Sequence, residues 1–355
     1  MATDLDDFIA TTEHQRPSRI LYRAGFTEDL RRRVVEHIGT ENIAGHYGFY
    51  ASAGVSLKRP EGLPPLDFSR YWHGVELPEG TRMSGGVARV PCDFFHFTHI
   101  VSPLRHATSL KEIEDYPFDD MHGWACSMTP EQVQQAHTDG RIVVGWVGHM
   151  YETAWQIRGL EQFLIDLVER PAWAECLLQR LADQNLIKAT AYAQAGADLI
   201  TTGDDVANQK ALMFSPDMWR RIFHSRWAKI WRRVKEIHPA TRIWYHSDGR
   251  IDAAVPDLVD AGLDILNPVQ PECVDAAFLK RTYGDRLAFW GGLGVQSVLP
   301  FGTPEEVREH VRRMIAVLGE SGGYVVAPSH MLERDVSYAN LKAMVQAIDD
   351  FGSYD

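Results

Sequence analysis

The sequence predicts an α/β fold, a (β/α)8 TIM barrel in which residues 1–355 form one domain. From about residue 142 onward, short apolar runs alternate with longer amphipathic segments, which is typical of strands buried on both faces and separated by helices. Polar side chains also follow nearly every run, as they do at a barrel mouth where the carboxyl ends of the strands converge. An open doubly wound sheet would offer a single crevice instead.

Six strands are predicted in this part of the chain, at residues 142–147, 198–202, 242–246, 264–267, 287–290 and 323–327. Residues 171–195 and 216–237 carry apolar side chains at helical spacing and are predicted helices. Another helix is expected to begin at Thr303-Pro304-Glu305-Glu306, where threonine caps the helix, proline takes its first position and a glutamate follows at the third.

The first 140 residues are less periodic. Residues 19–22 predict a first strand, and residues 94–101 predict another. Between them, residues 54–86 are rich in glycine and proline, and we interpret them as a long excursion over the barrel mouth. Long loops without regular structure in a compact domain are usually functional or flexible.

The composition narrows the function classes. A net charge of −12 argues against nucleic acid or an anionic membrane surface as a partner. No apolar stretch reaches the roughly 18 residues of a membrane span, and the N-terminus lacks a secretory signal. The four cysteines lie far apart, so we expect reduced thiols in a cytoplasmic protein; they are Cys92, Cys126, Cys176 and Cys273. The absence of G-x-G-x-x-G and P-loop motifs argues against a nucleotide cofactor.

Tyr245-His246-Ser247-Asp248-Gly249 ends one of the apolar runs. Residues 246 and 248 share a face of an extended strand, and an imidazole beside a carboxylate binds a divalent metal or forms an acid–base pair. The alternative is structural, with His246 bonded within the barrel top and Asp248 capping the next helix. His330 ends the last run, as a second imidazole of the site or as a loop histidine.

Asp204 and Asp205 follow the second run. Adjacent side chains point in different directions, so we expect one of them to be functional and the other structural. Glu152, after the first run, is a candidate fourth ligand or acid. Further candidates, for catalysis or for substrate binding, are Tyr151, Gln270, Gln296 and Arg158, which the sequence suggests is exposed.

Several motifs between residues 140 and 350 resemble those of the uroporphyrinogen decarboxylase superfamily. They are G-D-D (203–205), S-P-x-M-W (215–219), H-S-D-G (246–249), G-x-D-I-L-N-P-V-Q (262–270), P-F-G-T-P-E-E-V (300–307) and A-P-S-H (327–330). The superfamily fold is a (β/α)8 barrel, and its two main chemistries are cofactor-free decarboxylation and methyl transfer linked to corrinoids or thiols. The decarboxylases carry an M-R-Q-A-G-R-Y motif that grips substrate carboxylates. Here Tyr22-Arg23-Ala24-Gly25-Phe26 keeps Ala-Gly and Arg23, a predicted substrate-binding residue. It lacks the first Arg-Gln and the final Arg-Tyr of that motif, so the chain is more similar to the methyltransferase-like branch.

The methyltransferases of the superfamily bind zinc through H-x-C and a later cysteine. The resemblance places His246 at the histidine, with Asp248 and His330 at the two cysteines, so these three residues are the implied metal ligands. A His/Asp/His set is harder than the sulfur set and is typical of catalytic sites with open positions, which hold Zn²⁺, Fe²⁺ or Mn²⁺. It favours Lewis-acid activation of a carbonyl, phenol or methoxy oxygen. Glu152 or Asp205 is then a further ligand or an acid–base group, and Asp204, Gln270 and Gln296 contact the substrate.

The resemblance thus implies metal-dependent methyl transfer from a small organic substrate, with zinc as the metal. It also implies a corrinoid protein as a partner, and a homodimer. One alternative is a metal-free decarboxylase, in which His246 or His330 donates a proton while Arg23 and Arg158 pair with the substrate carboxylate. Another is a non-catalytic carrier or binding subunit that keeps the fold.

Overall fold

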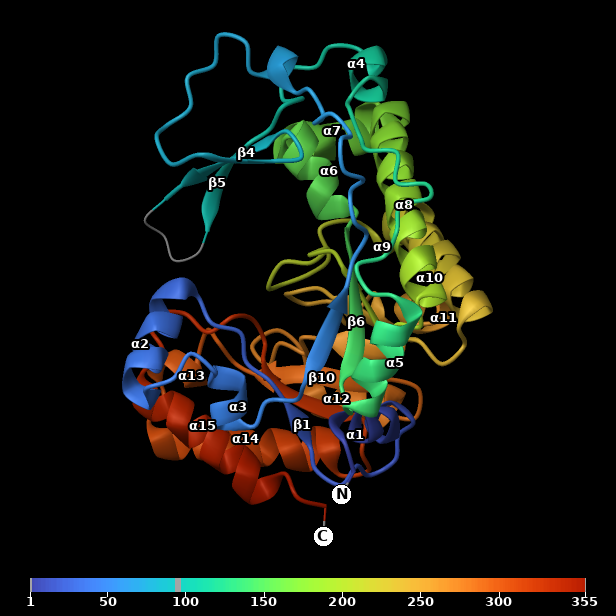
Figure 1. The fold of residues 1–355 in the computed structure, drawn as a ribbon. Coiled ribbons are helices and arrows are strands. Elements are labelled where there is room, and N and C mark those ends of the chain that lie inside the picture. The colour runs from blue at the N-terminus through green and yellow to red at the C-terminus, as the bar shows by residue number, and fades with distance from the viewer. Residues whose placement is uncertain (1, 93–96, 355) are drawn as a thin grey trace.

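The computed structural model describes residues 2–92 and 97–354 (Figure 1). Its centre is a curled, eight-stranded parallel sheet in the order β1-β11-β10-β9-β8-β7-β6-β2. The strands are β1 (Leu21–Tyr22), β2 (Ser52–Val55), β6 (Ile142–His149), β7 (Leu199–Gly203), β8 (Arg242–His246), β9 (Ile265–Asn267), β10 (Ala288–Leu293) and β11 (Tyr324–Pro328). No ladder joins β1 to β2 in the described residues, and one backbone hydrogen bond, from Tyr50 N to Tyr22 O, links the segments beside them. The fold is therefore TIM-barrel-like.

Helices follow most of these strands and cover the outer face of the sheet. They are α1 (Asp4–Thr12), α2 (Glu28–Ile38), α3 (Ile43–Tyr47), α4 (Leu110–Glu114), α5 (Pro130–Thr138), α6 (Tyr151–Arg158), α7 (Leu160–Glu169), α8 (Pro171–Gln194), α9 (Pro216–Trp219), α10 (Ser225–Ile237), α11 (Val255–Asp260), α12 (Ala276–Tyr283), α13 (Val298–Phe301), α14 (Pro304–Gly319) and α15 (Tyr338–Phe351). A short 3₁₀ helix spans Ser69–Tyr71, and a π-helical turn, Arg220–His224, joins α9 to α10. None of the described helices is both long and apolar enough to cross a membrane.

The strands predicted from residue 142 onward are all confirmed, as is the first strand near residue 21. The predicted helix 171–195 is α8, and the predicted helix 216–237 contains α9, the π-helical turn and α10. At α14, Thr303 accepts a hydrogen bond from Glu306 N while the Glu306 side chain accepts one from Thr303 N, which is the predicted capping box. The four described cysteines are free.

The inner face of the sheet is apolar near the amino ends of the strands. Its side chains form one buried cluster, made of Phe8, Leu21, Tyr50, Ile142, Leu199, Ile265, Ala288, Trp290, Val325 and Ala327. Phe8 comes from α1, and Arg242 at the start of β8 donates to Thr12 in the same helix at 3.1 Å. Because α1 closes the amino end of the sheet, the polar side chains on the inner face lie at the carboxyl ends of the strands.

An excursion between β2 and β6 carries a second, antiparallel sheet. Its strands are β3 (Arg82–Ser84), β4 (Val87–Pro91) and β5 (Thr98–Val101), in that order. The strand predicted at residues 94–101 is confirmed at Thr98–Val101, but it pairs with β4 and not with the large sheet. Residues 94–96 of that prediction lie outside the described part of the chain. The remaining strand of the large sheet is β2, which pairs in parallel with β6. In Figure 1 the small sheet lies beside α6, near the carboxyl ends of the large sheet.

Arg158 at the end of α6 ties the excursion to the helices. The expectation that this side chain is exposed is wrong, because it is 1% exposed. Its Nε donates to Asp166 Oδ2 at 2.6 Å, and its Nη1 donates to Leu104 O in the excursion at 2.5 Å. A guanidinium group that is buried this completely needs an opposite charge beside it, and the Asp166 carboxylate supplies that charge. Arg158 is therefore a structural residue and does not reach a substrate carboxylate.

We predict that Arg158→Ala lowers the free energy of unfolding by about 3–5 kcal/mol, because it leaves the buried Asp166 carboxylate without its main cation. Urea denaturation monitored by tryptophan fluorescence measures this change. The matched control is Arg170→Ala, since Arg170 also pairs with Asp166, at 3.3 Å, but is 44% exposed. The control should cost about 1 kcal/mol or less, and equal losses in the two variants would contradict the assignment.

Candidate functional site

The ends of β6, β7, β8 and β9 bring histidines and carboxylates together at one edge of the large sheet. The strand register places Gly203 beside His149 on one side and beside His246 on the other. His246 in turn lies beside Asn267. Two groups of residues there have ligand atoms that all lie within 4.8 Å of one another: His149, Glu152 and Asp204, and Asp205, His246 and Asp248.

In the second group, the His246 ring faces two carboxylates. Its Nε2 lies 3.6 Å from Asp205 Oδ1 and 3.9 Å from Asp248 Oδ1. Its Nδ1 lies 2.6 Å from Asn267 Oδ1, and the Asn267 amide nitrogen donates to Trp290 O at 3.0 Å. The asparagine oxygen therefore faces the ring, which assigns the proton to Nδ1. Nε2 then offers its lone pair, the arrangement found in metal-binding histidines.

Asp248 lacks a hydrogen-bond partner on the oxygen that faces His246. Its Oδ1 is buried and accepts no hydrogen bond from the described residues. Burial raises the pKa of Asp248 to about 6, an effect that His246 opposes and that the Asp205 carboxylate reinforces. The Asp248 backbone N–H donates to Asp205 Oδ1 at 2.8 Å and so fixes the second carboxylate. Two close carboxylates and an imidazole lone pair suit a divalent cation, so these residues fit a metal.

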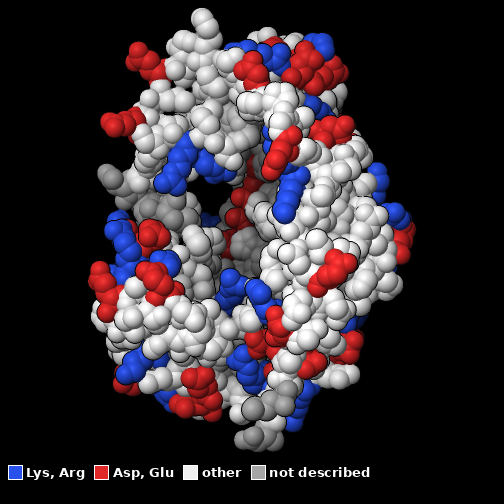
Figure 2. Space-filling view, viewed as in Figure 1, with Lys and Arg blue, Asp and Glu red and all other residues white. Residues whose placement is uncertain are grey.

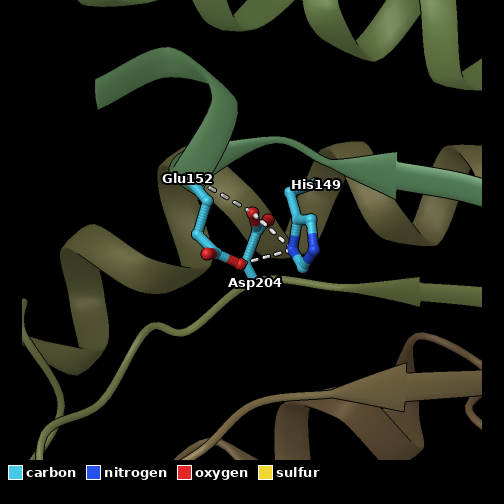
Figure 3. Close-up of side chains that lie close together, drawn as sticks. All are labelled: His149, Glu152 and Asp204. Carbon is cyan, nitrogen blue, oxygen red and sulfur yellow. Dashed lines mark hydrogen bonds and ion pairs between the residues drawn. The ribbon is translucent and has the colours of Figure 1, made fainter. Parts of the chain in front are cut away.

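The first group is centred on a wholly buried carboxylate (Figure 3). Asp204 Oδ1 accepts from Met150 N at 2.7 Å and from Glu152 N at 3.2 Å, while Oδ2 accepts from Trp227 Nε1 at 3.2 Å. Burial nevertheless raises the pKa of Asp204 to about 7. His149 Nδ1 lies 2.5 Å from Glu152 Oε2 and 4.0 Å from Asp204 Oδ1. Asp204 thus holds the β6–α6 turn and the inner side of α10 in place.

His149 and Glu152 form an ion pair at the end of β6. Burial lowers the pKa of His149, but the hydrogen bond and charge of Glu152 outweigh burial, so the pKa is raised. For Glu152, burial raises the pKa, and His149 outweighs it so that the pKa is lowered. Glu152 was predicted from the sequence, whereas His149 was not. The available signal was its position, because His149 ends the apolar run of β6 as His246 ends that of β8.

Four other residues predicted for the site, Arg23, Gln270, Gln296 and His330, lie around two adjoining cavities. One, of about 470 Å³, is lined by Phe97, Asp205, Asp248, Gln270, Val295, Gln296, Phe301, Ser329, His330, Met331, Glu333 and Asp335. The other, of about 250 Å³, has Arg23, His246 and His330 in its lining. The rings of His246 and His330 are 6.3 Å apart between centroids. His330 is outside both groups of ligand atoms but borders both cavities.

Three of these predicted residues have structural partners. Gln270 is 4% exposed, and its Oε1 accepts from Gly249 N at 2.9 Å, which holds the loop after Asp248. Gln296 Oε1 accepts from Gln209 Nε2 at 2.7 Å. Arg23 Nη1 donates to Ser52 Oγ at 3.1 Å.

Tyr151 points away from both cavities. Its side chain is 2% exposed and packs against Phe163, Phe214 and Phe223, with ring centroids 4.9 to 5.9 Å apart. Burial raises its pKa well above the ordinary value. In this position Tyr151 contributes to an aromatic core below α6.

The surface is hollowed above these strand ends (Figure 2). Asp and Glu side chains appear deep in the hollow, and Lys and Arg side chains lie along its edge. The charge therefore changes sign between the floor and the rim.

The two raised pKa values predict a pH dependence of folding stability. The folded pKa values of Asp204 and Asp248 exceed the ordinary 3.8, so the folded state binds more protons than the unfolded state between about pH 4 and pH 7. Without metal, the stability these groups contribute is present at low pH and is lost as pH rises through about 6 to 7. Asp248→Asn should therefore stabilise the chelator-treated protein near pH 8 by about 1 kcal/mol, allowing for solvent screening, and by about half of that near pH 5.

Urea denaturation at both pH values, in the presence of chelator, measures this difference. The control is Asp285→Asn, since the side chain of Asp285 is 79% exposed. A gain from Asp248→Asn that does not change with pH would rule out charge burial as its cause.

Comparisons with known proteins place the chain in a family. Residues 99–351 match the uroporphyrinogen decarboxylase (URO-D) family. A methylcobamide:CoM methyltransferase, MtaA, from Methanosarcina barkeri is 24% identical over 209 residues, covering 59% of this chain and 58% of the relative. A uroporphyrinogen decarboxylase from Methylococcus capsulatus is 26% identical over 198 residues, covering 52% and 51%. The chain thus spans little more than half the length of the curated relatives it matches.

A solved methyltransferase structure from Methanosarcina mazei superposes with a TM-score of 0.64 and 19% sequence identity, covering 99% of both chains. This likeness supports the fold. The family match extends over most of the chain and includes every strand-end residue of the two ligand groups. The protein therefore belongs to the uroporphyrinogen decarboxylase family, as the sequence motifs indicated.

Proposed function

We propose that this protein is a metal-dependent enzyme that removes a methyl group from a small organic substrate. The observation that carries the proposal is the group Asp205, His246 and Asp248, in which an imidazole lone pair and a buried, unpartnered carboxylate oxygen face each other across 3.9 Å. A buried carboxylate without a partner is costly, and a cation would remove that cost.

Asp205, His246 and Asp248 would hold the ion, and His330, which borders the same cavities, would complete the set. The oxygen-rich donor set suits Zn²⁺, with Fe²⁺ and Mn²⁺ as alternatives. When bound, such a metal acts as a Lewis acid toward the heteroatom that carries the methyl group. Asn267 keeps the His246 ring oriented through Nδ1, and Asp204 keeps the β7 end in place.

The ion pair of His149 and Glu152 would supply a proton. His149 is 27% exposed, and although burial lowers its pKa, the carboxylate of Glu152 raises it and so favours the imidazolium. When the methyl group leaves an alkyl or aryl methyl ether, the departing oxygen takes up a proton, and the product is an alcohol or a phenol. Glu152 would stabilise the imidazolium through Nδ1 before the transfer and would orient the ring afterwards.

We propose a corrinoid carried by a partner protein as the methyl acceptor. This step rests on the relative whose name describes transfer between methylcobamide and CoM. The hollow in Figure 2 is open to solvent in the described part of the chain, so a partner could approach the strand ends from this side.

A cofactor-free decarboxylase is the second candidate. It is favoured by the decarboxylases among the relatives and by Arg23, which lines the same 250 Å³ cavity as His246 and His330. In that reaction Arg23 would bind a substrate carboxylate, and one of the histidines would protonate the product carbon.

We predict that His246→Ala and Asp248→Ala each lower metal affinity at least about tenfold, because each removes a direct ligand. Elemental analysis of protein purified without chelator and reloaded with Zn²⁺, Fe²⁺ or Mn²⁺ measures occupancy. His122→Ala is the control, since His122 is exposed and remote from the strand ends. Methyl transfer to free cob(I)alamin from a panel of methoxylated and methylthio compounds should fall with metal occupancy.

Wild-type protein that stays free of metal after reloading would reject the proposed metal site. Release of CO₂ from a carboxylated substrate, unchanged by chelator and by Asp248→Ala, would instead establish the decarboxylase.

A further inference from the structure

Two arginines lie directly opposite each other in the small sheet of the excursion. Arg82 on β3 pairs with Arg89 on β4 in the antiparallel register. Residues in such a pair project from the same face with Cβ atoms about 5 Å apart, and like charges directly opposite each other destabilise the sheet. The hairpin thus carries an unfavourable pair of charges on one face.

That face is directed toward the barrel mouth. Arg89 Nη2 donates to Gln156 Oε1 on α6 at 2.7 Å. Gln156 lies four residues after Glu152, and residues at that spacing share a helix face about 6 Å apart. The arginine pair therefore lies about one helical turn beyond the acidic strand ends. Figure 2 agrees, because basic side chains line the edge of the hollow near the position that β4 and β5 occupy in Figure 1.

Neither arginine has a carboxylate partner among the residues that the structure describes. Arg89 is held by a neutral amide, and the exposed Arg82 side chain makes no hydrogen bond or ion pair with any described residue. Two side chains from outside the hairpin hold the turn between β3 and β4, at Gly85 and Gly86, in place. Trp72 Nε1 donates to Gly86 O at 3.1 Å, and the Tyr116 hydroxyl donates to Gly85 O. This support keeps the two arginine backbones in register and close together.

We propose that Arg82 and Arg89 form a subsite for the anionic end of the substrate, a carboxylate, sulfonate or phosphate group. The inference rests on the proposed function, because it assigns the opposite end of that substrate to Asp205, His246 and Asp248. Two adjacent guanidinium groups offer paired N–H donors that match such an anion. The strand ends carry the carboxylates of Glu152, Asp205 and Asp248, which repel such an anion. The substrate would therefore bind with its neutral, methyl-bearing end inward and its anionic end at the rim.

Bifunctional probes test the two ends together. Mono-hydroxamates of dicarboxylic acids, from succinate to sebacate, carry a metal-binding group at one end and a carboxylate at the other. Alkyl hydroxamates of matching length lack the carboxylate. Calorimetric titration into the Zn²⁺-loaded protein should show that the carboxylate improves affinity at one chain length, where the probe spans both ends, as expected for linked sites.

At that length, Arg82→Gln and Arg89→Gln should each weaken binding of the carboxylate probe about tenfold, because each removes a charge-assisted hydrogen bond to the carboxylate. Binding of the alkyl hydroxamate should be unchanged. Arg232→Gln is the matched control, because Arg232 is an exposed arginine on α10. Equal weakening in the control would show a net-charge effect and would overturn the subsite. So would a carboxylate advantage that is the same at every chain length.

Inorganic phosphate, titrated separately at constant ionic strength, distinguishes the other outcomes. Phosphate binding that Arg89→Gln abolishes, without any gain for the bifunctional probes, would make the pair a free-anion site and overturn its role with the substrate. If the alkyl hydroxamates fail to bind at all while phosphate still binds, the metal site fails and the anion subsite stands. Binding only of an acidic polypeptide, such as polyglutamate, would assign the pair to a protein partner and overturn the proposal.

Discussion

The site depends on the buried carboxylate of Asp204. It accepts two backbone N–H groups from the β6–α6 turn and the indole N–H of Trp227, and its own backbone N–H donates to His246 O at 2.9 Å. One residue, through its side chain and its backbone, therefore fixes the ends of β6, β7 and β8 relative to one another. An acceptor that satisfies several donors inside the protein rigidifies the groups around it. Asp204 thus determines where Asp205 and His246 can point.

The apolar runs made the strands of the second half predictable, because a strand buried on both faces has a continuous apolar sequence. Strand β2 lacks that signal. Its residues, Ser-Ala-Gly-Val at 52–55, are small, and only two of the four are buried. Residues 98–101 instead have the composition of a strand but pair locally with β4. Composition cannot identify the strand with which such a short segment pairs. The excursion was therefore predictable from the sequence, but the sheet within it was not.

Periodicity also accounts for much of the site, since the carboxyl ends of parallel strands meet at one edge. His246 and Asp248 were named from that rule, as were Asp204, Asp205 and Glu152. His149 follows the same rule, but no neighbouring motif drew attention to it. Tyr151, which was predicted to be catalytic, faces away from the strand ends for a local reason. Adjacent residues on a helix point about 100° apart, so Glu152 can face the strand ends only when Tyr151 faces the aromatic core.

The charge distribution also bears on the choice between the two proposed reactions. Four carboxylates, from Glu152, Asp204, Asp205 and Asp248, lie at the strand ends with two imidazoles. A polycarboxylate would need several cations to enter this interior, and Arg158 is committed to Asp166 within the core. A methyl donor has a neutral reacting end and places no added negative charge among these carboxylates. The acidic floor is therefore more compatible with methyl transfer than with decarboxylation of a substrate rich in carboxylates.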